Sequence, residues 1–174
     1  MEYYLLTQDT RIADYAQPLG GPKFFSPKSA SYQERFHALK DEILQFYTHG
    51  SDEYLDYIER PYPLVSERLK EALERCQKGI LYKLAILTDL QQSNQTVYWF
   101  LAPETVSCLS SETEWHKNGA IKKLVLDSSK IGSYKVFQIA GAIEPYLVVD
   151  LDAAESVLSL DPQGIQLTRL EFIR

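Results

Sequence analysis

The stretch PYPLVSERLKEALERCQKG at residues 61–79 constrains the fold of this chain more than any other part of the sequence. Pro61 and Pro63 favour an extended backbone, because proline fixes φ and pushes the preceding residue towards β or polyproline II geometry. Ser66 suits the N-cap of a helix, where its hydroxyl accepts a backbone N–H, and Gly79 suits the helix end. Apolar residues between them recur at helical spacing: Leu69, Ala72, Leu73 and Cys76. The stretch therefore predicts a short strand followed by a capped helix.

The same order of residue types returns near the C-terminus. Pro145 takes the place of Pro61, and Asp150 takes the capping position of Ser66. Ala153, Val157 and Leu160 then form the apolar stripe, and Gly164 marks the expected end of the helix. Two interpretations remain open: a duplicated strand–cap–helix unit, or two capped helices that are alike without a common origin.

Length and composition predict one globular domain spanning residues 1–174. The net charge of −6 argues against a nucleic-acid partner, because nucleic-acid-binding domains are usually basic. The first residues lack the basic and long apolar segments of a signal peptide, and no stretch reaches the length of a membrane span. We therefore expect a soluble, cytoplasmic protein with no membrane partner. Cys76 and Cys108 are expected to be buried thiols rather than a disulfide.

The remaining pattern predicts further helices and strands. A capping box of Ser31 and Glu34 opens a predicted helix over residues 32–47. A loop over residues 8–30, held by Phe24 and Phe25, precedes this helix. Alternating or continuous apolar runs predict strands at 2–7, 80–87, 96–101, 121–126, 134–140, 146–149 and 165–172. We expect an α+β domain with a mainly antiparallel sheet of six to seven strands, and about three helices packed on one face.

The sequence contains no common catalytic or metal-binding motif, so we expect neither enzymatic activity, nor a catalytic residue, nor a cofactor or metal. The alternative is a hydrolase or transferase whose site assembles from distant residues. His116, Glu112, Glu114 and Cys108 are the candidates for it. A polar surface loop explains the first three better, and a buried thiol explains Cys108 better than a nucleophile does.

An acidic, tyrosine-containing stretch is the best candidate for partner binding. Its residues are Asp52, Glu53, Tyr54, Asp56, Tyr57 and Glu59. Tyrosine supplies a large contact area, and carboxylates favour a basic partner and accelerate encounter with it. The alternative is a solvated acidic face with no partner.

The order of motifs along the chain resembles a family of bacterial immunity proteins of polymorphic-toxin systems, the large α+β family numbered eleven. The matching segments are EYYL from Glu2, PLVS at 63–66 leading into LKEAL at 69–73, VYWFL at 97–101 before CL at 108–109, KVFQI at 135–139 before LVVD at 147–150, and GIQL from Gly164. One feature departs from the family pattern, because neither Trp99 nor Trp115 follows a glycine. The matching positions are predicted caps and core residues, so no functional residue can be carried over.

The resemblance implies a protein that binds and neutralises a cognate bacterial toxin through a protein–protein interface. It implies a protein partner, and the acidic stretch suggests that the partner has a basic surface. The alternative is a non-catalytic structural or regulatory module of a larger assembly. Exposed aromatic side chains on the strand at 96–101 would favour that alternative.

Overall fold

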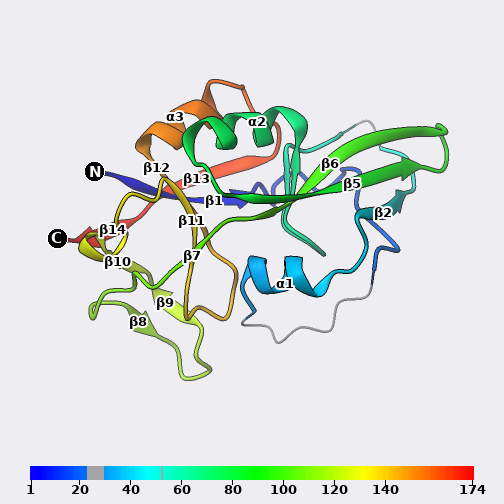
Figure 1. Ribbon diagram of the computed structural model, residues 1–174. Coiled ribbons are helices and arrows are strands. Elements are labelled where there is room, and N and C mark those ends of the chain that lie inside the picture. The colour runs from blue at the N-terminus through cyan, green and yellow to red at the C-terminus, as the bar shows by residue number, and fades with distance from the viewer. Residues whose placement is uncertain (23–29, 52) are drawn as a thin grey trace.

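The computed structural model describes residues 1–22, 30–51 and 53–174. These residues form three α-helices and fourteen strands, arranged in two five-stranded and two two-stranded sheets (Figure 1). The predicted α+β class is therefore confirmed. The predicted single, mainly antiparallel sheet of six to seven strands is wrong. A strand pattern in the sequence shows which residues are extended, whereas the partner of each strand is decided by tertiary packing.

The terminal sheet combines strands from both ends of the chain. Its order is β13 (Ile165–Arg169), β1 (Tyr3–Gln8), β12 (Leu147–Asp150), β11 (Val136–Ile139) and β7 (Thr105–Val106). All its pairs are antiparallel except β7 with β11, so the sheet is mixed.

The central sheet is built from the middle of the chain. Its order is β2 (Ile43–Thr48), β5 (Leu81–Asp89), β6 (Asn94–Ala102), β4 (Leu64–Ser66) and β3 (Tyr57–Ile58). Its only parallel pair is β2 with β5. The small sheets pair β10 (Val125–Asp127) with β14 (Glu171–Ile173), and β8 (Glu114–Trp115) with β9 (Ile121–Lys123). A short 3-10 helix, η1, covers Ser128–Lys130.

Both predicted strand–cap–helix units form. Strand β4 leads into α2 (Glu67–Cys76), and the Ser66 hydroxyl accepts a hydrogen bond from the Leu69 N–H. Strand β12 leads into α3 (Leu151–Leu158), and the Asp150 carboxylate accepts one from the Ala153 N–H. These contacts satisfy N–H groups that the first turn of each helix leaves unpaired.

The two units also share a sheet topology. The order β5-β6-β4-β3 in the central sheet corresponds to β13-β1-β12-β11 in the terminal sheet, and every pair in both series is antiparallel. We call β3, β4, α2 and β5 the first unit, and β11, β12, α3 and β13 the second unit. The shared topology favours a duplicated unit, in which the N-terminal strand β1 fills the place that β6 fills in the central sheet.

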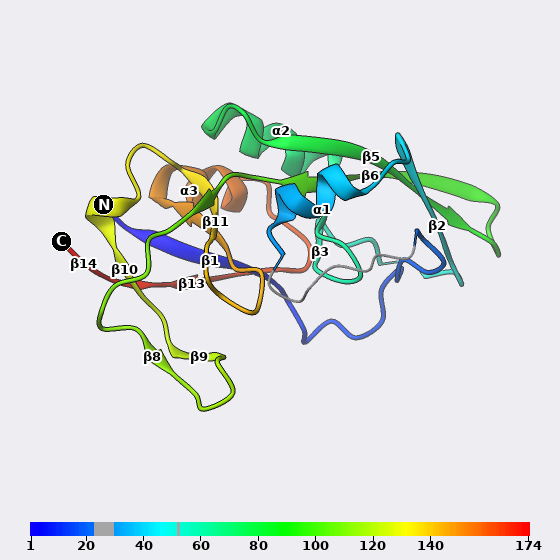
Figure 2. The ribbon, with the colours of Figure 1, turned by 60° about the horizontal axis from the view of Figure 1, so that its bottom comes forward.

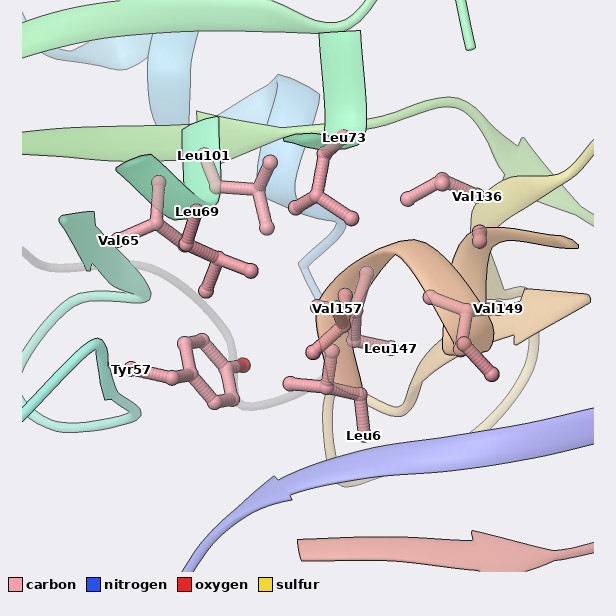
Figure 3. Close-up of a cluster of buried hydrophobic side chains, with 12 residues drawn as sticks. Leu6, Tyr57, Val65, Leu69, Leu73, Leu101, Val136, Leu147, Val149 and Val157 are labelled. Atoms are coloured by element: carbon pink, nitrogen blue, oxygen red, sulfur yellow. The ribbon is translucent and has the colours of Figure 1, made fainter. Parts of the chain in front are cut away.

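Helices α2 and α3 pack side by side and share one core (Figure 1). Figure 3 shows Leu69 and Leu73 of α2 close to Val157 of α3, with Val149 and Leu6 from the strands. All five side chains are buried, which confirms Leu73 as a core residue. Burial of this apolar surface holds the two units together.

The helix predicted over residues 32–47 is wrong in its second half. Helix α1 ends at Ala38, and the chain continues as strand β2, in which Leu44 and Phe46 are buried while Ile43 and Tyr47 are exposed. The apolar residues of this segment fit both a helical and an alternating pattern. The segment forms a strand because it pairs with β5. The predicted capping box of α1 is confirmed.

Helix α1 does not lie on the side of the central sheet that carries α2. Phe36 stacks on Phe100 of β6, with ring centroids 6.0 Å apart, within a second apolar core on the opposite face. The prediction that all helices share one face is therefore wrong. Phe24 and Phe25 lie outside the described residues. In the part of the chain that the structure describes, no helix has the length and apolar character needed to cross a membrane.

Candidate functional site

The acidic stretch is only partly at the surface. Asp52 lies outside the described residues, Glu53 is exposed, Tyr54 and Glu59 are partly buried, and Asp56 and Tyr57 are buried. Asp56 is 3% exposed and Tyr57 only 1% exposed, so neither side chain can contact a partner in this conformation. A role of this stretch in partner binding stays a prediction, and it would rest on Glu53, Tyr54 and Glu59.

Asp56 is the centre of a hydrogen-bond network between the two units. Its carboxylate accepts hydrogen bonds from Ser66 Oγ at 2.6 Å, Arg68 Nε at 2.8 Å, Arg68 Nη2 at 2.6 Å and the Gln163 N–H at 2.7 Å. Arg68 Nη1 also donates to the Leu160 carbonyl, at 2.8 Å. Burial alone would raise the pKa of Asp56, but the donors from Arg68, Ser66 and Gln163 outweigh it, and the pKa lies below its ordinary value. Asp56 therefore connects the N-terminal end of α2 to the segment that follows α3.

Both tyrosines of the stretch make contacts within the fold, Tyr57 as a buried residue and Tyr54 as a partly buried one. Tyr57 packs in the shared core, and its hydroxyl lies 3.5 Å from that of Tyr32 on α1. Burial raises the pKa of both phenols, that of Tyr32 to about 12. The Tyr54 hydroxyl donates to Asp89 at the end of β5, at 3.4 Å. These contacts fix the positions of both tyrosine side chains in the fold.

A cleft of about 770 Å³ lies where the terminal sheet meets the edge of the central sheet. Figure 2 shows the elements around it, with β1, β3 and α1 close together. Its lining includes Tyr15, Tyr32, Arg35, Glu59, Arg60, Glu144 and Tyr146. Because the cleft combines aromatic rings with both signs of charge, it suits a polypeptide segment better than a single ion.

Among the described residues of the predicted stretch, only Glu59 lines this cleft. Its carboxylate accepts from the Gln8 N–H at 2.9 Å, and its own N–H donates to Gln8 Oε1 at 3.0 Å. Burial raises the pKa of Glu59, the Gln8 N–H and Arg60 oppose that rise, and Glu144 adds to it. The two hydrogen bonds join the ends of β1 and β3, which belong to different sheets.

Sequence reasoning missed the rest of the cleft. Tyr15 and Arg35 come from segments predicted as a loop and a helix, and only tertiary contacts bring them into the same cleft as Glu59. The sequence carries no local signal for this convergence, because residues far apart in the chain reveal their proximity only in the folded structure.

The alternative catalytic set does not line this cleft. Cys108 is buried beyond β7, and burial raises the pKa of its thiol to about 11. Glu114 pairs with Lys122, at 3.0 Å, on the small β8–β9 sheet. His116 and Glu112 are exposed in the same region. Over residues 1–22, 30–51 and 53–174, no three His, Cys, Asp or Glu side chains are grouped so that they could hold a metal ion.

Comparison with known proteins adds no assignment to this geometry, because no protein-family model and no curated protein matches the sequence.

Proposed function

We propose that this chain is an immunity protein that binds and neutralises a cognate bacterial toxin in the cytoplasm. The observation that carries the proposal is the order of five motifs along the chain, which resembles the immunity family described above. Two of those motifs contain the caps Ser66 and Asp150 and lead into the packed helices α2 and α3. These motifs therefore stabilise the fold of the domain. Other residues, at the surface, would recognise the toxin.

The proposed partner is a protein with a basic surface. The net charge of −6 favours encounter with such a partner, because long-range attraction raises the association rate. The proposed activity is binding, so it requires a complementary surface and no reaction at this chain.

The experiment that tests the proposal starts from the genes next to this one, where the proposal expects a toxin gene. The C-terminal toxin domain is expressed in a bacterial host with this chain, with an empty vector, or with the core variant Leu73→Ala as a folding control. We expect growth arrest with the empty vector and growth with the parent chain. Equal growth arrest with and without the parent chain would exclude immunity for that pair.

A structural or regulatory module of a larger assembly is the second candidate. One observation favours it: Val97 of β6 is 41% exposed on the central sheet, and Trp99 is partly exposed on the same face. Light scattering over a range of protein concentrations separates a self-assembling module from a monomer. A mass that rises with concentration would support assembly.

A further inference from the structure

The central sheet leaves part of one face uncovered. Strand pairing aligns Ile43 with Leu84, Leu84 with Trp99, and Ile86 with Val97, so these five apolar side chains are cross-strand neighbours on β2, β5 and β6. Ile43 is 43% exposed and Val97 41% exposed, while the other three are partly exposed. We call these five residues the open face. Contiguous apolar surface of this kind marks interaction sites, whereas scattered apolar residues do not.

The open face exists because the strands are longer than the helix above them. Strands β5 and β6 have nine residues each, and α2 has ten. Nine strand residues span about 30 Å, whereas ten helical residues span about 15 Å. Figure 1 shows the β5–β6 hairpin extending past α2. Val65 and Leu101 on this face are fully buried near α2, and exposure rises towards Val97.

Trp99 stands at the boundary between the covered and uncovered parts. Its indole N–H donates to Glu67 Oε2 at 2.7 Å, and Lys70 Nζ lies 4.7 Å from its ring centroid. These contacts hold the ring in place before any partner arrives, which lowers the entropy lost on binding. Tryptophan is also one of the residue types enriched among binding hot spots.

An acidic helix edge borders the open face. Glu67 contacts Trp99, and Glu74 pairs with Lys70 at 2.8 Å beside the same ring. Glu71 lies four residues after Glu67 and three before Glu74, which places it along the same side of α2. Three carboxylates against one ammonium leave this edge negative. A complementary partner therefore has apolar side chains flanked by lysine or arginine.

We propose that the open face, with the acidic edge of α2, is the surface on which the toxin docks, through an apolar strip flanked by basic residues. This inference rests on the proposed function. A second copy of the chain fits less well, because a copy brings the same acidic edge and no matching basic one.

Titration calorimetry measures binding of the full 174-residue chain to the C-terminal domain of the toxin that the proposed function expects in a neighbouring gene. Val97→Lys places a cation at the exposed end of the open face. Thr168→Lys is the matched control, since Thr168 is an exposed, β-branched residue on β13. We expect Val97→Lys to weaken the affinity by about tenfold or more, as loss of a hot-spot contact does. Thr168→Lys should leave the affinity unchanged, and circular dichroism should show both variants folded.

The charge of the helix edge is tested in a second arm. Glu71→Gln with Glu74→Gln removes two negative charges beside the open face. Glu112→Gln with Glu155→Gln removes two exposed charges elsewhere, so both variants change the net charge of −6 equally. We expect the first variant to slow association by about threefold or more at low salt, with a smaller effect at high salt. The second should change the rate much less.

The outcomes separate the two proposals. A parent chain that does not bind the toxin domain overturns the proposed function, and the docking surface with it. Tight binding by the parent with an unchanged Val97→Lys affinity overturns only the docking surface. Weaker binding by Arg60→Glu, in the cleft, with Val97→Lys unaffected would place the toxin at the cleft instead. A parent dimer that Val97→Lys dissociates would show that a second copy covers this face.

Discussion

Asp56 and Arg68 form a two-pronged ion pair, with Arg68 Nε 2.8 Å from Oδ1 and Nη2 2.6 Å from Oδ2. The carboxylate side chain is 5% exposed and the guanidinium side chain 49%. Arg68 also reaches the carbonyl of Leu160 beyond α3, so this pair ties the first unit to the second. Asp56, which the sequence analysis placed in an acidic partner-binding stretch, thus helps to hold the two units together.

Arg68→Ala should destabilise the fold, because it leaves the buried Asp56 carboxylate without two of its donors. We expect a loss of about 1.5–3 kcal/mol in the free energy of unfolding, the range for hydrogen bonds to charged groups. Arg169→Ala is the control, since Arg169 pairs with Glu2 at a more exposed site and should cost about 0–1 kcal/mol. Urea denaturation measures both, and equal losses would contradict a special role for Arg68.

The contribution of Asp56 should depend on pH. Its folded-state pKa lies below the ordinary value of 3.8, so its stabilising contribution is present above that value and is lost as pH falls through the folded pKa. The difference in unfolding free energy between the parent and Asp56→Asn should therefore shrink as pH falls below about 4. Urea titrations from neutral pH to pH 2 measure this difference, and a gap that stays constant would contradict the lowered pKa.

The contribution of Glu59 to stability should depend on pH in the opposite direction. Its folded-state pKa lies above the ordinary value of 4.5, so its stabilising contribution is present below that value and is lost as pH rises through the folded pKa. Glu59→Gln keeps an acceptor for the Gln8 N–H and removes the charge. Relative to the parent, this variant should gain stability between pH 4 and pH 7. The exposed Glu155→Gln serves as control, and thermal melts at both pH values test the prediction.

Leu73→Ala should cost about 2–5 kcal/mol, as other truncations of buried leucine do. Leu73 is fully buried in the core that α2 and α3 share, so truncation leaves a cavity there. Leu158 is 59% exposed on α3, and Leu158→Ala should change stability little. Chemical denaturation compares the two variants, and a Leu73→Ala chain as stable as the parent would contradict the core assignment.

The two cysteines should differ in reactivity. Cys108 is fully buried and burial raises its pKa to about 11, whereas Cys76 is partly exposed. Iodoacetamide at pH 8 should therefore label Cys76 in the native protein and reach Cys108 only in urea. Peptide mass spectrometry locates the label. Rapid labelling of native Cys76→Ser would show that Cys108 is accessible.

The segment 32–48 shows a case in which apolar spacing does not distinguish a helix from a strand. Its capping box at Ser31 is a local device, and it forms as predicted. The apolar residues after it fit a helix and a strand almost equally well, so the outcome depends on whether a partner strand is available. Strand β5 provides that partner, and Leu44 and Phe46 are buried by the pairing.

The candidate sites were less predictable than the fold. The sequence singled out Glu59, but it gave no sign that Gln8 would bond to it from another sheet. It also suggested an exposed role for Asp56, which lies instead among Arg68, Ser66 and Gln163. A carboxylate looks the same in a sequence whether it is solvated or paired, since its partner comes from a distant segment.

The sequence by itself determined the two strand–cap–helix units, because caps, prolines and apolar spacing act within a few residues of one another. Ser66, Leu73 and Asp150 have the predicted places for that reason. Tertiary structure alone decided that the strands would divide between two sheets, that Asp56 would be buried, and that Val97 would be left exposed beyond α2. These features depend on which distant segments pack together, and that choice is made by the energy of the whole core rather than by any local pattern.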